Sequence, residues 1–166
     1  MRVQAFIGIG SNLGDRLAHC RAALDRLALL PGTALTRVSP LFESEPQEGV
    51  EGGPFLNAVA EIATSLPPDQ LLDHLQEIEV ALGRAADHLP GTARTMDLDL
   101  LLYGDTVIRE PDLTVPHPRM ADRRFVLLPL AALAPTLCHP VLQATVAELL
   151  RRLGPEGPLL ASGVRR

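Results

Sequence analysis

RTMDLDLLLYG, residues 94–104, is the stretch of sequence that decides the fold. It is predicted to be a β-strand, because its apolar run ends at a glycine and its polar residues stand at its start. Side chains alternate between the two faces of a strand, so Asp97 and Asp99 should share one face. The other face should carry the alternate leucines, Leu98, Leu100 and Leu102. The uninterrupted apolar run after Asp99 is typical of a buried strand.

The two aspartates are candidate ligands for a divalent cation. Their Cα atoms should lie about 6–7 Å apart, so both carboxylates can reach one ion or hold two between them. Mg²⁺ takes oxygen ligands, commonly one or two carboxylates together with substrate phosphates. Arg94 adds a bidentate phosphate donor nearby. The alternative is an edge strand with a solvated acidic face. The cation site is favoured because Asp is depleted in strands and a buried carboxylate needs a counter-charge.

The hydrophobic pattern elsewhere predicts two strand–helix–strand units. Apolar runs at 3–9, 33–42 and 55–63 are typical of strands, the second interrupted near Pro40. Apolar residues at helical spacing predict one helix after an N-cap at Asn12 and a second from Pro68 to Gly83. With the aspartate strand, the order is β-α-β-β-α-β, which is the ferredoxin-like arrangement. We therefore expect an α+β fold in which helices cover an antiparallel sheet.

The remaining segments carry a turn, a loop histidine and C-terminal helices. Gly104-Asp105 should form a hairpin turn, with residues 106–108 returning beside the aspartate strand. His117 stands between two prolines, so it cannot lie in a regular helix or a central strand. A rigid loop with an imidazole suits phosphate binding or proton transfer, and an exposed surface histidine is the alternative. Further helices are predicted over residues 122–133 and 145–153.

The glycines at 8, 10 and 14 do not form a dinucleotide-binding fingerprint. That fingerprint needs its third glycine three residues after the second, and here the separation is four. We interpret these glycines as a tight turn from the first strand into the first helix.

The composition indicates one globular domain over residues 1–166, with a weakly ordered tail from about residue 154. The net charge of −5 and the 3% aromatic content argue against a nucleic-acid partner. No apolar run reaches the roughly 20 residues that span a bilayer, so no membrane partner is expected. Cys20 and Cys138 are isolated, which excludes a C-x-x-C motif and makes a reducing cytoplasm the expected location.

Four stretches together resemble the 6-hydroxymethyl-7,8-dihydropterin pyrophosphokinase family of folate biosynthesis. They are FIGIGSNLGDR at 6–16, FLNAV at 55–59, RTMDLDLLLYG at 94–104 and LTVPHPRMADRRFVLLPLAAL at 113–133. That family transfers pyrophosphate from ATP to the hydroxymethyl group of the pterin and releases AMP. The resemblance implies the same activity here, with ATP and the pterin as small-molecule substrates, two Mg²⁺ ions as cofactors, and a monomeric protein.

The resemblance also implies a role for individual residues. Asp97 and Asp99 would hold the two Mg²⁺ ions, and with Arg84, Arg94 and His117 they would form the catalytic set. The residues expected around ATP are Gln76, Glu79, Arg84, Arg94, Leu100, Thr114, His117 and Arg123. Those expected around the pterin are Ser44, Pro46, Phe55, Asn57 and Phe125, with the phenylalanines stacking on the ring and Asn57 bonding its edge. The loop at 84–93 is expected to close over the bound substrates.

Two other functions fit parts of the pattern. A Mg²⁺-dependent nucleotidyltransferase also uses paired aspartates, but it would release pyrophosphate rather than AMP. A non-catalytic ferredoxin-like module would bind a small molecule without turnover, and it gives no joint reason for Arg94, Asp97, Asp99 and His117.

Overall fold

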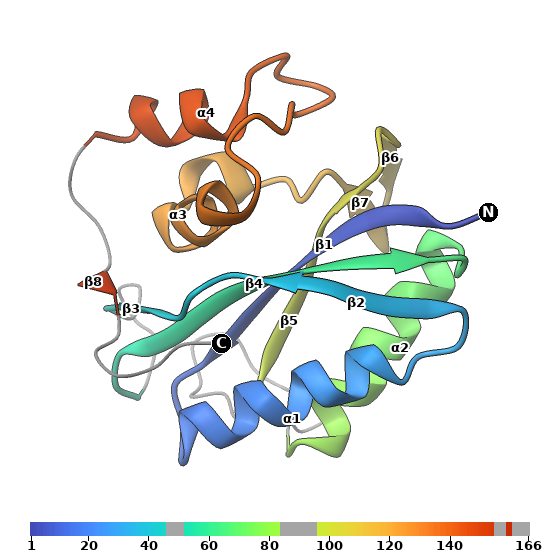
Figure 1. Ribbon diagram of the computed structural model, residues 1–166, viewed down its shortest axis with the longest axis vertical. Helices are drawn as coiled ribbons and strands as arrows, with labels where there is room; N and C mark the ends of the chain where they lie inside the picture. Colours follow the sequence, from blue (N-terminus) through green and yellow to red (C-terminus); the bar gives the residue numbers. More distant parts are fainter. Residues whose placement is uncertain (46–51, 84–95, 155–158, 161–166) are drawn as a thin grey trace.

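A computed structural model of the protein describes residues 1–45, 52–83, 96–154 and 159–160. Its strands are β1 (Val3–Ser11), β2 (Thr33–Val38), β3 (Phe42–Ser44), β4 (Phe55–Thr64), β5 (Asp97–Tyr103), β6 (Ile108–Glu110), β7 (Leu113–Val115) and β8 (Leu159–Leu160). Its helices are α1 (Arg16–Ala28), α2 (Pro68–Ala81), α3 (Arg124–Leu133) and α4 (Val146–Arg152), with a 3₁₀ turn at Met120–Asp122. Helices α1 and α2 cover one face of the main sheet, and α3 and α4 lie over the other (Figure 1).

The main sheet has the order β5-β1-β4-β3-β8, and β2 also pairs with β4. The pairs β1–β4, β1–β5, β2–β4 and β3–β4 are all antiparallel. Strand β1 is therefore central, with β4 on one side and β5 on the other. This confirms the predicted ferredoxin-like antiparallel sheet with two covering helices.

The core has two parts, one on each face of the sheet. On the α1 and α2 face, Ile7 and Ile9 of β1 pack with Leu24 and Leu75. On the α3 and α4 face, the buried cluster includes Phe6, Val59, Leu101, Leu127 and Leu130. Because both faces of β1 are covered, its side chains are apolar or very small from Ala5 to Gly10.

A register shift corrects the predicted alternation along β5. Leu98 and Leu100 pack on the α1 and α2 face as expected, but Leu102 lies in the cluster on the opposite face. The pairing of β1 with β5 shifts between Phe6 and Ile7, and such a bulge changes which face the following side chains take. Asp97 and Asp99 lie before the shift.

The predicted interruption near Pro40 is confirmed, because the segment at 33–42 is divided into β2 and β3, with residues 39–41 between them. Pro40 has no N–H to donate to a sheet. Ser39 keeps this segment attached to β4: its N–H donates to Val59 O (2.9 Å), and its Oγ accepts from Val59 N (2.9 Å).

The first helix begins later than predicted. Its N-cap is Asp15, whose Oδ1 accepts from Ala18 N (3.1 Å), rather than Asn12. Asn12 is buried before the helix, and Leu13 is 46% exposed instead of joining the apolar stripe. The predicted glycine turn is also only partly correct, because Gly8 and Gly10 lie within β1 and Gly14, at φ 68°, makes the turn.

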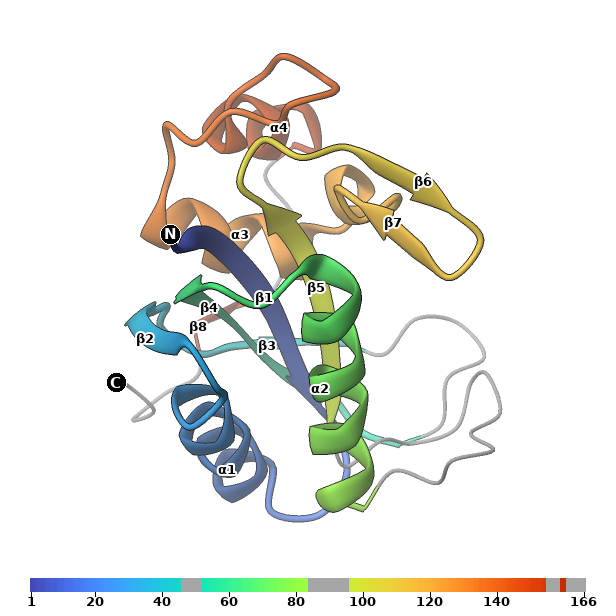
Figure 2. The ribbon, with the colours of Figure 1, turned by 90° about the vertical axis from the view of Figure 1, so that its right-hand side faces the viewer.

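The predicted hairpin partner of β5 is wrong. Gly104 does form a turn at φ 52°, but β6 then pairs with β7 in a separate two-stranded sheet. The backbone of β5 instead forms a hydrogen bond with His117, whose N–H donates to Leu101 O (2.9 Å). Figure 2 shows the β6–β7 hairpin beside β5.

The C-terminal helices are found at the predicted places, α3 with Pro129 inside it and α4 after an N-cap at Thr145. Of the tail, residues 159–160 pair with β3 as β8, whereas 155–158 and 161–166 lie outside the described residues. Across the described ranges, every helix is too short or too polar to cross a bilayer.

A half-buried ion pair connects β2, β4 and the end of α3. Glu61 of β4 is 7% exposed, and it accepts from Arg37 Nε (3.1 Å) and Thr36 Oγ1 (2.7 Å). Arg37 Nη1 also donates to Leu133 O, the last residue of α3 (2.7 Å). Burial alone would raise the pKa of Glu61, but the hydrogen bonds from Arg37 and Thr36 outweigh it and lower this pKa below its ordinary value of 4.5.

Glu61→Gln should lower the free energy of unfolding at pH 7 by roughly 1–3 kcal/mol, the range for a lost hydrogen bond to a charged group. Because the folded-state pKa is depressed, this stabilisation is present above pH 4.5 and is lost as the pH falls below it. Urea unfolding at several pH values checks both points, and Glu77→Gln on the exposed side of α2 is the control. Equal acid sensitivity of Glu61→Gln and the unsubstituted protein would contradict this assignment.

Candidate active site

The candidate site is built on a row of paired residues that crosses three strands. Gly10 of β1 pairs with Asp97 of β5 on one side and with Asn57 of β4 on the other. Directly paired residues of antiparallel strands place their side chains on the same face. Neighbouring strands are about 4.8 Å apart, so the Cα atoms of Asp97 and Asn57 should be separated by roughly 10 Å.

The middle of this row has no side chain. A Cβ added at Gly10 would lie 3.5 Å from Asn57 Oδ1 and 3.5 Å from Phe55 Cδ1, and one added at Gly8 would meet Leu101 at 3.4 Å. Gly8 in turn pairs with Asp99. The two glycines therefore let neighbouring side chains approach the backbone of β1 between the carboxylates and the Asn57 amide, and we call this part of β1 the floor of the site.

The carboxylates stand at the β5 end of the floor. Asp97 and Asp99 are partly exposed, and Asp99 Oδ1 lies 4.0 Å from His117 Nε2. Over the described ranges of the chain, no three His, Cys, Asp or Glu side chains gather closely enough to hold a metal by themselves. Two carboxylates nevertheless suit Mg²⁺, which commonly completes its oxygen shell with substrate phosphates and water.

His117 is held in one orientation and one tautomer. Its Nδ1 accepts from Arg119 N (3.2 Å), so the ring proton of the neutral imidazole is on Nε2, which faces Asp99. Burial lowers the pKa of His117 to about 4, and the charges of Arg123 and Arg119 act in the same direction against Asp97. His117 is therefore a neutral hydrogen-bond donor in the site, and its side chain, at 20% exposure, is not a surface histidine.

Glu79 connects α2 to the start of β5. Its carboxylate accepts from Leu98 N (2.8 Å), and the residue is 6% exposed. It is therefore a buried carboxyl group at the start of β5 and not a solvated helix residue. Gln76, three residues earlier, lies on the exposed side of α2 in a hollow that also includes Asp73 and Val80.

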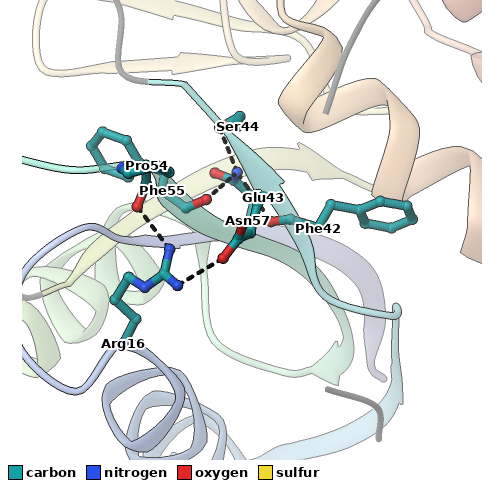
Figure 3. Close-up of polar contacts among 7 residues, drawn as sticks. All are labelled: Arg16, Phe42, Glu43, Ser44, Pro54, Phe55 and Asn57. Carbon is teal, nitrogen blue, oxygen red and sulfur yellow. Dashed lines mark hydrogen bonds and ion pairs between the residues drawn. The ribbon is translucent and has the colours of Figure 1, made fainter. Parts of the chain in front are cut away.

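Asn57 is oriented by contacts to β3, as Figure 3 shows. Its Nδ2 donates to Ser44 Oγ (2.7 Å) and lies 3.4 Å from the carbonyl oxygens of Phe42 and Phe55. With the amide nitrogen committed to the protein, the Oδ1 atom is presented beside Gly10. The side chain is 3% exposed, so this acceptor is fixed and well shielded.

The two aromatic side chains predicted at the pterin come from two different elements, β4 and α3. Phe55 begins β4, and Phe125 lies in the first turn of α3, which packs across β4 and β3. The guanidinium carbon of Arg123 lies 5.5 Å from the centre of the Phe125 ring. Arg123, predicted at the nucleotide, and Phe125, predicted at the pterin, are therefore in contact with each other.

The other predicted site residues are not brought together with the carboxylates or lie outside the described residues. Thr114 lies exposed on β7 with its Oγ1 near Glu110 O (3.3 Å). The side chain of Leu100 is buried in the core on the α1 and α2 face, so the structure does not bring it together with the carboxylates. Pro46, Arg84 and Arg94, with the loop at 84–93, lie outside the described residues.

Sequence reasoning missed the structural part played by Gly8, Gly10, Arg16 and Glu43. The glycines were interpreted as a turn, although a residue without a side chain inside a strand indicates close approach of something else. Arg16 donates to Glu43 Oε1 and Pro54 O. These partners lie 27 and 38 positions away in the sequence, so no local pattern indicates the contacts.

Comparison with known proteins places the chain among enzymes of folate synthesis. The sequence model of a family described as 7,8-dihydro-6-hydroxymethylpterin-pyrophosphokinase matches residues 6–135. A 2-amino-4-hydroxy-6-hydroxymethyldihydropteridine pyrophosphokinase of Pseudomonas aeruginosa is 45% identical over 82% of this chain and 84% of its own length. Its Bacillus subtilis counterpart is 43% identical over 87% of this chain and 84% of its own length.

Longer proteins match as well. The folic acid synthesis protein fol1 of Schizosaccharomyces pombe is 40% identical over 95% of this chain, which spans only 21% of that protein. A crystal structure of HPPK-DHPS from Plasmodium falciparum superposes with a TM-score of 0.74 at 16% identity, over 92% of this chain and 44% of that one. At that identity the superposition supports the fold alone.

In the metal-free protein, the His117 ring should stay neutral with its proton on Nε2 from pH 8 down to about pH 5, and it should titrate near pH 4. Because the folded pKa lies below the ordinary 6.5, the folded state loses stability as the pH falls from 6.5 toward 4. Imidazole nitrogen NMR over this range checks the prediction.

His117→Asn is the control for that measurement, because an amide oxygen can still accept from Arg119 N while the ring signal disappears. Titration of the ring near pH 6.5, or a proton on Nδ1, would contradict the orientation described above.

Proposed function

Since this chain belongs to the 7,8-dihydro-6-hydroxymethylpterin-pyrophosphokinase family, we propose that it transfers the diphosphate group of ATP to the hydroxymethyl group of 6-hydroxymethyl-7,8-dihydropterin and releases AMP. The observation that carries the proposal is the row from Asp97 through Gly10 to Asn57. The row has a carboxylate at one end of the glycine floor and an amide of fixed orientation, beside Phe55, at the other.

Asp97 and Asp99 would hold two Mg²⁺ ions together with the ATP phosphates. The donor set fits, because both carboxylates are partly exposed on one face of β5 and carboxylate oxygens are ligands that Mg²⁺ takes together with phosphates. Bound Mg²⁺ would neutralise the phosphate charge that otherwise repels an attacking oxygen. Glu79 would support this end of the site by holding the backbone of Leu98 between the two aspartates.

Basic and neutral donors would complete the phosphate site. The Nε2–H of His117 points toward Asp99, where a phosphate oxygen bound at the aspartates would also lie within reach. Arg123 stands at the start of α3 beside Phe125. Arg84 and Arg94 remain predictions from the sequence for the same role. Such fixed donors stabilise the charge that develops on phosphoryl oxygens during transfer.

The pterin would bind at the Asn57 end of the floor. Asn57 Oδ1 accepts a hydrogen bond, so it would pair with an N–H group on the edge of the ring. Phe55 and Phe125 would stack on the ring faces, and Ser44 would support the amide. Pro46 is proposed from the sequence at the same edge.

The transfer step would then depend mainly on aligning the hydroxymethyl oxygen of the pterin with the β-phosphorus of ATP. The hydroxymethyl oxygen would form a bond to the β-phosphorus of ATP and lose its proton to solvent water, while the bond from that phosphorus to the AMP oxygen breaks. His117 is a poor general base, since its Nδ1 already accepts from Arg119 N and its pKa is low. Positioning of two bound substrates can by itself supply a large part of such a rate enhancement.

The product of the reaction tests this function directly. Incubation with Mg²⁺, ATP and 6-hydroxymethyl-7,8-dihydropterin should yield AMP and the diphosphorylated pterin in equal amounts. Release of pyrophosphate would indicate a nucleotidyltransferase, and saturable pterin binding without turnover would indicate a binding module. The monomeric state and the cytoplasmic location stay predictions, which light scattering and cell fractionation can check.

Asp97→Ala and Asp99→Ala should each lower turnover by at least roughly a hundredfold with little effect on folding. Each change removes a proposed metal ligand and also relieves repulsion between the two carboxylates in the free protein. Steady-state assays and thermal melts check this, with Asp105→Ala in the exposed turn after β5 as the control. Near-normal turnover of either variant at ordinary Mg²⁺ would refute the metal assignment.

Phe125→Ala should weaken pterin binding more than ATP binding, because stacking on a flat heterocycle contributes roughly 1–3 kcal/mol. Phe125→Leu keeps apolar bulk without the ring, so it separates stacking from packing within the α3 cluster. Calorimetry with each ligand and a thermal melt of each variant provide the measurement. If both ligands lose affinity equally and the melting temperature falls, Phe125 serves the core instead.

A further inference from the structure

Arg16, the first residue of α1, binds both sides of the segment that joins β3 to β4. Its Nη2 donates to Glu43 Oε1 (2.7 Å), and its Nη1 donates to Pro54 O (2.9 Å). Figure 3 shows one guanidinium reaching both partners. We call Arg16, Glu43 and Pro54 the Arg16 clamp.

The clamp lies next to the residues that orient the candidate pterin site. Glu43 is followed by Ser44, and Pro54 is followed by Phe55. Ser44 and Phe55 are themselves paired, and that pair is the last of the β3–β4 ladder before the connecting segment. Arg16 therefore fixes the separation of the two strands at the end where Ser44 and Asn57 meet.

The clamp does not touch the floor of the site. Glu43 lies between Phe42 and Ser44 in a strand, so its side chain faces the side of the sheet opposite to Ser44. Its neighbour across the ladder, Leu56, packs on the α1 and α2 face. Any effect of Arg16 on a ligand must therefore pass through the backbone of β3 and β4.

The end of the short strand β3 depends on contacts such as the Arg16 clamp to stay in place beside β4. Strand β3 has only three residues, and Asn57 depends on it for the Ser44 hydroxyl and the Phe42 carbonyl. Asn12, which precedes α1, makes a second contact with the segment between β3 and β4. Its Nδ2 donates to Gly53 O at 3.4 Å. The Arg16–Glu43 pair is partly exposed, at 30% and 45% of the two side chains, so it should contribute little to global stability.

We propose that Arg16 is a positioning residue that sets the affinity for the pterin, and not for ATP, by holding Ser44, Phe55 and Asn57 in register. This inference rests on the proposed function for the identity of the ligand. Loss of the clamp lets the end of the β3–β4 ladder move, which turns the Asn57 amide and the Phe55 ring away from the ligand. The carboxylates on β5, two strands away, keep their geometry.

Binding measurements on Arg16→Ala give the main test. The dissociation constant for the pterin should rise by roughly tenfold, as misplaced binding groups cause, while that for a non-hydrolysable ATP analogue stays unchanged. Arg16→Lys can make only one of the two contacts and should fall in between. Arg21→Ala, an exposed arginine on the same helix, is the matched control and should bind as the unsubstituted protein does.

Two further variants separate the halves of the clamp. Glu43→Gln removes the ion pair but leaves the bond to Pro54 O, and it should cause a smaller loss than Arg16→Ala. The double exchange Arg16→Glu with Glu43→Arg restores an ion pair but supplies no donor for Pro54 O. Recovery of pterin affinity in the double exchange would overturn the part assigned to Pro54.

A readout without substrate distinguishes failure of this inference from failure of the proposed function. Backbone amides of residues 42–44 and 55–57 should exchange faster in Arg16→Ala than in the unsubstituted protein, with equal melting temperatures. If the unsubstituted protein binds no pterin, the proposed function fails and faster exchange alone still supports the clamp. Equal exchange, or equal pterin affinity in a folded Arg16→Ala variant, overturns it.

Discussion

A single strand, β1, sets how far apart the two ends of the candidate site lie, because it pairs with β4 on one side and with β5 on the other. Two covered faces would ordinarily demand large apolar side chains throughout. Gly8 and Gly10 break that rule on the face where Asp97, Asp99 and Asn57 stand. The pairing register therefore does two things at once: it completes the sheet, and it sets the distance between the acidic end and the amide end of the floor.

Polar groups around this floor are held by the protein itself. Glu79 is bound to Leu98 N, the Asn57 amide nitrogen to Ser44, and His117 Nδ1 to Arg119 N. Each of these bonds satisfies one atom of a buried or half-buried group and leaves another atom with a defined direction. These polar groups are thus oriented before any ligand binds, which would lower the ordering that ligand binding at the proposed site requires.

Much of the fold could be predicted from the sequence, because alternation, helical spacing and turn residues are local signals. The order of the strands, the helix at 68–83 and the loop position of His117 all follow from such signals. The bulge beside Phe6 could not be predicted, since it arises from pairing with a distant strand, whereas the interruption near Pro40 follows from the proline itself. The same limit applies to the site: Asp97 and Asp99 are two residues apart, whereas Arg16 and Glu43 meet only in three dimensions.

The division of the sheet edge at Pro40 also affects how copies of the chain meet one another. A long, flat outer strand offers a template for strand addition by another molecule, which leads to aggregation. Here the outer side of β4 is occupied by two short strands, β2 and β3, with a proline between them and β8 against β3. Such an interrupted edge is a poor template for intermolecular β-pairing on this side of the sheet.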